Sequence, residues 1–281
     1  MNKSVKQRLF GSPNIQVPVI GQGTWAMEGG DRAKTIAAIR RGLDLGMTHI
    51  DTAEMYGGGE VEQIVGEAID GRRGEVFLVS KVMPQNASRQ GTVRACERSL
   101  RRLRAEVLDC YLLHWPSNHP LVDTIAAFET LVRDGKIKTW GISNFDEEEV
   151  EEAVRLAGPG RVACNQVLYH LGERRIEHYV LPACEQHGIA LVGYSPFGQG
   201  RFRSHPVLDE IARGRGATPR QVALAFLTRH PITFAIPKAS QISHVEENAG
   251  AGTLQLTEAE IGRIDAAFPA GRPRRRSLPM L

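Results

Sequence analysis

The sequence is poor in cysteine and has no long apolar run. Its four cysteines, Cys96, Cys110, Cys164 and Cys184, stand far apart without any Cys-x-x-Cys spacing. This pattern is typical of buried free thiols and argues against a disulfide framework or a metal site. No segment reaches the roughly 18 apolar residues that a membrane-spanning helix needs, and residues 1–10 lack the apolar core of a signal peptide. We therefore expect a cytoplasmic protein without a membrane partner or a bound metal.

The excess of positive over negative charge is also small. The formal net charge is +3, and four arginines, Arg272, Arg274, Arg275 and Arg276, lie within the last eleven residues. A nucleic-acid-binding protein usually spreads Lys and Arg along one face with aromatic residues between them, and the sequence shows no such face. We expect no nucleic-acid partner and interpret residues 271–281 as a short basic tail.

Short β-branched segments alternate with amphipathic stretches along the chain, in eight strand–helix units. The predicted strands are Val19–Gly23, Thr48–Asp51, Val76–Val82, Leu108–Leu113, Thr139–Ile142, Ala163–Val167, Ala190–Tyr194 and Thr233–Pro237. Eight parallel strands with helical crossovers close most naturally into a barrel, for which about 250 residues suffice. We predict an α/β fold: one (β/α)8 TIM barrel domain over residues 1–281, with its chemistry at the C-terminal strand ends.

Local signals add detail to this fold. Arg8–Phe10 and Ile15–Val17 flank a Gly-Ser-Pro-Asn turn and predict an N-terminal β-hairpin that caps the N-terminal end of the barrel. Thr218, Ser243 and Thr257 are each followed three residues later by Gln or Glu, which predicts helix starts at these positions.

Three ionisable residues interrupt the apolar pattern of the predicted strands. Asp51 ends the second strand, Lys81 lies near the end of the third, and His114 follows the fourth. Taken singly, Asp51 and Lys81 could form a structural ion pair, and His114 could be a hydrogen-bonded core residue. Because these strands are neighbours in a barrel, their ends converge on one patch, and Tyr56 follows Asp51 in the same loop. That patch can carry out acid–base chemistry.

A phenol with a pKa near 10 exchanges protons poorly at neutral pH, and a nearby ammonium group lowers that pKa. We expect Lys81 to act on Tyr56 in this way, Asp51 to keep Lys81 charged, and His114 to donate a hydrogen bond to a substrate oxygen. The sequence shows no nucleophilic Ser or Cys beside a base. This favours proton donation to a carbonyl oxygen, with the hydride supplied by a cofactor.

Together these residues resemble the aldo-keto reductase family, and the resemblance extends over nearly the whole chain. The motifs occur in the family's order: Gly21-Gln22-Gly23-Thr24-Trp25, Asp51-Thr52-Ala53-Glu54-Met55-Tyr56, Ser80-Lys81, Leu113-His114-Trp115-Pro116, Gly141-Ile142-Ser143-Asn144-Phe145, Asn165-Gln166, Ile236-Pro237-Lys238 and Glu247-Asn248. The resemblance implies that Asp51, Tyr56, Lys81 and His114 form a catalytic tetrad, with Tyr56 as the proton donor. It also implies NADPH (NADP+) as the cofactor.

The same resemblance implies a set of cofactor contacts. Ser143, Asn144 and Gln166 would hold the nicotinamide carboxamide, Tyr194 would stack on its ring, and Lys238 would bind the 2′-phosphate. From pattern alone, Tyr194 and Gln166 could equally be packing residues. The expected cofactor-binding residues are Gly23, Thr24, Trp25, Asp51, Ser143, Asn144, Gln166, Tyr194, Ser195, Phe197, Gly198, Lys238, Ala239, Ser240, His244, Glu247 and Asn248.

One position departs from the family pattern. His244 stands where many relatives place an arginine that grips the 2′-phosphate. Imidazole is mostly neutral at pH 7, so we expect a moderate preference for NADPH over NADH. The run Gly57–Gly59 lacks a following Gly-Lys-Ser/Thr, and we interpret it as a turn into a helix that begins near Glu60.

We expect the substrate at Trp25, Tyr56, His114 and Trp115, with Phe145, Phe197 and Met27 as further wall residues. The sequence resembles bacterial reductases of methylglyoxal and other small aldehydes, so we expect a small carbonyl substrate. The arginines of the tail could fold over the site and attract anionic substrates such as keto acids. Two alternatives stay open: an NADPH-bound regulatory or sensor subunit with little turnover, and a phosphate-handling barrel lyase or isomerase. We expect a monomer.

Overall fold

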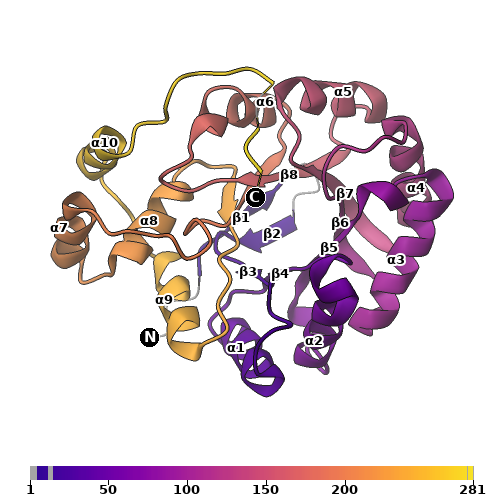
Figure 1. The fold of residues 1–281 in the computed structure, drawn as a ribbon, viewed down its shortest axis with the longest axis horizontal. Helices are drawn as coiled ribbons and strands as arrows, with labels where there is room; N and C mark the ends of the chain where they lie inside the picture. Colours follow the sequence, from indigo (N-terminus) through magenta and orange to yellow (C-terminus); the bar gives the residue numbers. More distant parts are fainter. Residues whose placement is uncertain (1–4, 12–14, 277, 281) are drawn as a thin grey trace.

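The computed structural model describes residues 5–11, 15–276 and 278–280. Within these residues, eight strands form one parallel sheet in chain order from β3 to β10 (Figure 1). The strands are β3 (Gln22–Gly23), β4 (His49–Asp51), β5 (Phe77–Val82), β6 (Leu108–Leu113), β7 (Ile137–Ser143), β8 (Val162–Leu168), β9 (Ala190–Tyr194) and β10 (Thr233–Ala235).

The two ends of this sheet meet and close a barrel. Parallel bridges join Ile20 to Ala235 and Gly23 to Lys238, and the backbone N–H of Gly21 donates to the carbonyl of Ala235 at 2.8 Å. A Cβ on Gly23 would lie 2.4 Å from the carbonyl oxygen of Ile236, so glycine is required for this close approach. The predicted (β/α)8 barrel is confirmed, although β3 itself is only two residues long.

Helices surround the barrel (Figure 1). They are α1 (Arg32–Asp44), α2 (Glu60–Ala68), α3 (Arg89–Leu103), α4 (Leu121–Arg133), α5 (Glu147–Ala157), α6 (Val180–Gln186), α7 (Pro206–Arg215), α8 (Pro219–Leu227), α9 (Ile242–Ala251) and α10 (Glu258–Ala267), with short 3-10 helices η1 (Tyr56–Gly59), η2 (Arg73–Glu75), η3 (Pro84–Asn86) and η4 (Arg175–Glu177). Two helices, α7 and α8, follow β9, where the sequence pattern predicted one. None of the helices in the described part of the chain is long and apolar enough to cross a membrane.

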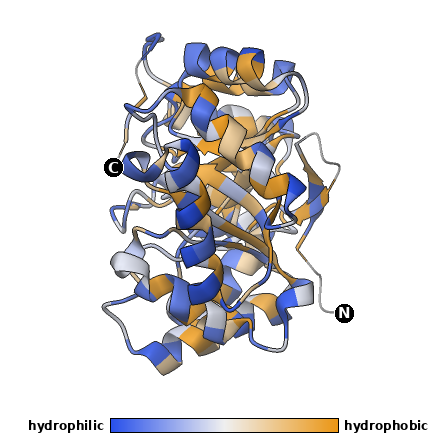
Figure 2. Ribbon diagram, turned by 90° about the vertical axis from the view of Figure 1, so that its right-hand side faces the viewer, coloured by the Kyte–Doolittle hydropathy of each residue, from blue (hydrophilic) through white to orange (hydrophobic). Residues whose placement is uncertain are grey.

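The predicted N-terminal hairpin is present. β1 (Gln7–Phe10) pairs antiparallel with β2 (Ile15–Pro18), and residues 12–14 of its predicted turn lie outside the described residues. Phe10 packs against Phe77 and Phe234, with ring centroids 4.9 and 5.1 Å away, and so covers the N-terminal end of the barrel. Figure 2 shows the hairpin and the C-terminal tail on opposite sides of the molecule.

Two of the three predicted helix starts are confirmed. The hydroxyls of Thr218 and Thr257 accept hydrogen bonds from Gln221 N at 3.2 Å and Glu260 N at 3.3 Å, and both form capping boxes. The prediction for Ser243 was wrong. The extended residue that precedes α9 is Gln241, so the helix begins at Ile242 and Ser243 already lies inside its first turn.

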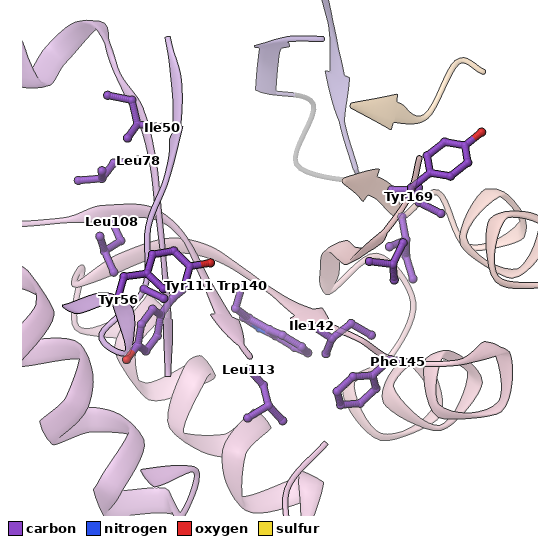
Figure 3. Close-up of a cluster of buried hydrophobic side chains, with 14 of the residues drawn as sticks. Ile50, Tyr56, Leu78, Leu108, Tyr111, Leu113, Trp140, Ile142, Phe145 and Tyr169 are labelled. Carbon is purple, nitrogen blue, oxygen red and sulfur yellow. The ribbon is translucent and has the colours of Figure 1, made fainter. Parts of the chain in front are cut away.

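The apolar core lies between the barrel and the helices and holds the strand ends in place. Figure 3 shows Ile50 of β4, Leu78 of β5, Leu113 of β6 and Ile142 of β7 among its side chains. Successive side chains of a strand point to opposite faces. Burial of Ile50, Leu113 and Ile142 outside the barrel therefore turns the residues that follow them toward its interior.

Candidate active site

A cavity of about 660 Å³ opens at the C-terminal ends of the strands. Most of the residues that the sequence analysis assigned to a site line this one cavity. They are Gly23, Thr24, Trp25, Asp51, Tyr56, His114, Trp115, Ser143, Asn144, Gln166, Tyr194, Ser195, Phe197 and Lys238. Lys81 lies buried directly beneath it.

A buried ion pair forms the floor of the cavity. Lys81 Nζ donates to Asp51 Oδ1 at 2.6 Å, to the carbonyl of Thr52 at 2.9 Å and to Tyr56 Oη at 3.2 Å. Gln166 Nε2 donates to the other oxygen of Asp51 at 2.7 Å. Burial opposes the charge on Lys81, but the neighbouring Asp51 and Tyr56 oxygens outweigh it, so the pKa of Lys81 is raised. The lysine is therefore an ammonium ion in contact with a phenol.

The direction of the pKa shift of Tyr56 differs from the expectation. We predicted that Lys81 lowers it, but burial of the phenol raises the pKa of Tyr56 above its ordinary value. Lys81 acts against this shift, and the carboxylate of Asp51 adds to it. The prediction considered only the ammonium neighbour and left out the loss of water around a buried phenolate. Tyr56 is thus protonated at neutral pH, which is the form that a proton donor requires.

The loop between Asp51 and α2 places Tyr56 over Lys81. Glu54 anchors this loop by accepting hydrogen bonds from Met83 N and Asn86 Nδ2, both at 2.9 Å. After Tyr56 the glycines at 57, 58 and 59 have φ of 56°, 62° and 99°, a left-handed course that residues with a Cβ rarely adopt. The chain then enters α2 at Glu60, as predicted.

His114 is held as a neutral imidazole. Burial and the nearby ammonium of Lys81 lower the pKa of His114 to about 2. Its Nδ1 is buried without a hydrogen-bond partner in the described residues. A buried N–H donor without a partner is rarer in proteins than an acceptor without one. This favours the tautomer that carries its proton on Nε2.

Amide and hydroxyl groups form a second network beside the tetrad. Asn144 Nδ2 donates to the carbonyl of His114 at 3.0 Å, and Tyr194 Oη donates to Asn144 Oδ1 at 3.0 Å. Ser143 Oγ donates to the carbonyl of Gln166 at 2.9 Å. These contacts join the ends of β6, β7, β8 and β9 into one surface.

Unusual backbone geometry gathers at this cavity. Six non-glycine residues in the described ranges have positive φ, and four of them line the cavity: Ala26 at 56°, Asn144 at 60°, Ser195 at 49° and Gln199 at 55°. This conformation costs about 1–2 kcal/mol for a residue with a Cβ. Such strain persists where surrounding structure enforces it, and it is common at functional sites.

Several expected residues do not line the cavity. Gly198 lines a smaller neighbouring cavity of about 300 Å³, and the lining of the main cavity does not include Ala239, Ser240, His244, Glu247 or Asn248. Met27 and Phe145, which we expected in the substrate wall, are buried in the apolar core instead. Figure 3 shows Phe145 beside Ile142 in that core. The left-handed turn at Ala26 precedes Met27, and β7 ends before Phe145, and neither side chain lines the cavity.

Eight further residues of the main-cavity lining were not among the site residues predicted from the sequence. They are Ala26, Met55, Pro196, Gln199, Gly200, Arg220, Ile236 and Met280. Met55 and Pro196 neighbour predicted site residues, a signal that was present in the sequence. Arg220 and Met280 lie far from the motifs in sequence, and only the fold brings them to the cavity.

The tail folds over the mouth of the barrel, but its arginines do not reach the cavity. Arg276 Nε lies 2.7 Å from Glu148 at the start of α5, and Arg275 stacks on Tyr179 at 4.5 Å from the ring centroid. Among the described residues of the tail, Met280 lines the cavity. In Figure 1 the tail crosses α6 toward α5 and ends near the barrel axis. The expected attraction of anionic substrates by these arginines therefore has no support in this geometry.

Comparisons with known proteins agree with this architecture. The model of the aldo/keto reductase family matches residues 19–268. Methylglyoxal reductase YeaE of Escherichia coli (strain K12) is 46% identical over 266 residues, which cover 92% of this chain and 94% of that protein. Glyoxal reductase of Bacillus subtilis (strain 168) is 32% identical over 268 residues, with 95% and 94% covered. An aldo-keto reductase from Klebsiella pneumoniae, solved in complex with NADPH, has 44% identity and a TM-score of 0.92 over 99% of this chain and 100% of that chain.

Proposed function

Because this chain belongs to the aldo/keto reductase family, we propose that it uses NADPH to reduce small aldehydes and ketones, in particular α-oxo aldehydes such as methylglyoxal. It is an enzyme that reduces carbonyl groups, as members of this family do. The observation that carries the proposal is the contact of the Lys81 ammonium with Tyr56 Oη at 3.2 Å on the floor of a cavity. The names of the Escherichia coli and Bacillus subtilis relatives support the substrate class.

The groups around the cavity fit a nicotinamide dinucleotide. Gln166 uses its amide nitrogen for Asp51, which leaves its carbonyl oxygen as an acceptor for a carboxamide. Tyr194 supplies an aromatic face, and the exposed ammonium of Lys238 suits a phosphate. A bound reduced nicotinamide supplies the hydride for the reaction.

Proton transfer then depends on groups of this chain. Tyr56 donates its phenolic proton to the substrate oxygen, and the phenolate that remains lies beside the Lys81 ammonium. Asp51 holds Lys81 in place and keeps it charged. Because burial raises the pKa of Tyr56, the phenol keeps its proton until the substrate oxygen gains negative charge and accepts it. Lys81 then stabilises the phenolate that remains.

His114 has a different part in this proposal. A neutral imidazole with its proton on Nε2 can donate a hydrogen bond to the substrate oxygen but cannot lose a proton to it as an acid. We assign His114 to orientation of the carbonyl and Tyr56 to proton donation.

Two further expectations remain predictions. One chain supplies every group that this reaction needs, so we propose that the enzyme acts as a monomer, which size-exclusion chromatography would test. The expected cytoplasmic location also stays a prediction. The alternative of a regulatory subunit with little turnover is decided by the same kinetics that test the main proposal.

Steady-state NADPH oxidation with methylglyoxal, glyoxal and neutral aldehydes tests the function. Tyr56→Phe should lower turnover by about 10²–10⁴-fold, the usual contribution of a general acid, while NADPH still binds. Tyr179→Phe is the matched control, because that phenol lies outside the cavity lining and should leave turnover unchanged. Full turnover by the Tyr56 variant, or no turnover of any carbonyl by the wild type, would contradict the proposal.

A further inference from the structure

Two cationic side chains, Lys238 and Arg220, line the cavity without a carboxylate partner in the described residues. Lys238 follows β10, and Arg220 is the second residue of α8. The carboxylate of the lining, Asp51, is already committed to Lys81 at 2.6 Å and to Gln166 at 2.7 Å. The cavity therefore keeps two positive charges that nothing in its lining neutralises, and it favours an anionic ligand.

Two aromatic rings hold the guanidinium of Arg220. Its Cζ lies 4.8 Å from the ring centroid of Phe197 and 5.4 Å from that of Phe202. The two rings pack edge to face at 5.6 Å, in the loop between β9 and α7. These contacts restrict rotation of the Arg220 side chain, which reduces the entropy that binding would cost, and no hydrogen bond or ion pair among the described residues occupies its N–H donors.

The geometry of these donors selects the kind of anion. A planar fork of N–H groups matches the oxygens of a phosphate or carboxylate with two parallel hydrogen bonds. A small neutral aldehyde offers no such group, whereas a dinucleotide carries several phosphates. His244 lies outside the cavity lining, and its ring lacks a planar fork of N–H donors.

We infer that Arg220 is a phosphate-binding residue of the dinucleotide site, acting as the second cation beside Lys238. The inference rests on the proposed function. It assigns to α8 the guanidinium that the sequence analysis found missing at position 244, and it implies a stronger grip on the cofactor than His244 alone predicts.

The test is to measure the binding of NADPH and of NADH directly, by fluorescence titration or calorimetry. Arg220→Met removes the charge but keeps an unbranched side chain against the two rings, and Arg220→Lys keeps the charge without the fork. The matched control is Arg213→Met, which removes the same charge from an exposed position on α7 outside the cavity lining. Circular dichroism and urea midpoints check that each variant is folded.

We expect Arg220→Met to raise the Kd for NADPH by about tenfold or more, the effect of losing one charge-assisted hydrogen-bond pair. Arg220→Lys should raise the Kd less, and Arg213→Met should leave it within about twofold. High salt should weaken binding by the wild type more than by Arg220→Met. A loss for NADPH alone assigns Arg220 to the 2′-phosphate, and an equal loss for NADPH and NADH assigns it to the pyrophosphate.

Unchanged NADPH binding by a folded Arg220→Met variant overturns the inference. If Arg220→Met does not fold, unchanged binding by Arg220→Lys, which cannot form the fork, overturns the bidentate contact. A wild-type protein that binds neither nucleotide would instead refute the proposed function itself, so the two failures are distinguishable.

Discussion

Replacement of Asp51 by Asn would leave Lys81 in a site with no counter-ion. Lys81 is fully buried, and its other contacts are the Thr52 carbonyl at 2.9 Å and Tyr56 Oη at 3.2 Å. Neither carries a negative charge while Tyr56 is protonated. Gln166 already donates to Asp51 at 2.7 Å, so an Asn oxygen at this position would turn toward Gln166 and present its amide N–H₂ to the ammonium.

Removal of one partner of a buried pair costs roughly 3–5 kcal/mol, because the other charge stays desolvated. We expect this loss in the free energy of unfolding for Asp51→Asn and also for Lys81→Met. The double variant carries no unpaired charge, so its loss should be well below the sum of the two single losses. Urea unfolding of the three variants and the wild type closes the double-mutant cycle.

The pH dependence gives a second, independent signature. In the wild type the pKa of Lys81 is raised above 10.5, so its contribution to stability is complete below that pH and disappears as the pH rises through the folded-state pKa. In Asp51→Asn, burial is no longer opposed, and the folded-state pKa should fall below that of the unfolded chain. This variant should therefore gain stability between pH 7 and about 10, where the unfolded state binds more protons.

Activity separates the two roles of the pair. The double variant should recover much of the stability that each single variant loses, yet it should have turnover as low as that of Lys81→Met, because no ammonium remains beside Tyr56. Strictly additive stability losses, or a double variant with restored turnover, would refute the reasoning.

Three further predictions concern other parts of the chain. Burial lowers the pKa of His49 to about 4, so the wild type should lose stability as the pH falls from 6.5 toward 4, by up to about 1.4 kcal/mol per pH unit from this group; urea midpoints at pH 7 and 4.5 should show a smaller loss in His49→Leu. Ala26 has φ of 56°, so Ala26→Gly should raise the free energy of unfolding by about 1 kcal/mol. Ala37→Gly, at an exposed position within α1, should instead lower it by about 1 kcal/mol, and urea unfolding of both variants should show these opposite signs. Deletion of residues 271–281 removes Met280 from the cavity wall, so kcat/KM for bulky ketones should rise relative to that for small aldehydes. The preference between charged and neutral aldehydes should not change, and a changed preference would show that the tail arginines act on the substrate.

The clustering of Asp51, Lys81 and His114 was predictable because it depends on the order of the strands along the chain. Parallel strands in chain order have their C-terminal ends at one rim, so ionisable residues at the ends of consecutive strands must meet. Asp51, Lys81 and His114 occupy such positions, and the register confirms the neighbourhood, with Asp51 opposite Val79 and Lys81 opposite Leu112. Hydrophobic periodicity, together with the expected order of strands in a barrel, therefore indicated which side chains could interact.

Properties that depend on loops and on solvent were not predictable in the same way. The sign of the pKa shift of Tyr56 depends on how completely the loop buries the phenol, which no motif encodes. Met27 and Phe145 have the apolar character of wall residues, but a left-handed turn and a strand end direct them into the core. Arg220 follows a proline at the start of a helix, where sequence pattern indicates an exposed surface residue, and only the course of the loop after β9 shows its two aromatic neighbours.

Shielding of charge from solvent does not by itself identify the active site, because the chain contains another, largely buried charge cluster. Glu177 accepts from Arg174 at 2.7 Å and from Arg229 at 2.8 Å. Burial opposes the charge on Glu177, but the two guanidinium groups outweigh it and lower its pKa to about 2. None of the three lines the main cavity. Arg174 also binds Asp265 at 2.5 Å, so the cluster joins α10 to segments that lie far away in sequence.

The pair of Lys81 and Asp51 differs in what it contacts. A buried ion pair adds little net stability, and apolar residues of similar volume often replace such a pair without loss. A pair retained for the fold alone would need no phenol within hydrogen-bond distance and no open space above it. Here the ammonium touches Tyr56, and Asp51 and Tyr56 both line the cavity. The proposed stabilisation of a phenolate after proton transfer would account for a charge at this position, whereas stability of the barrel does not.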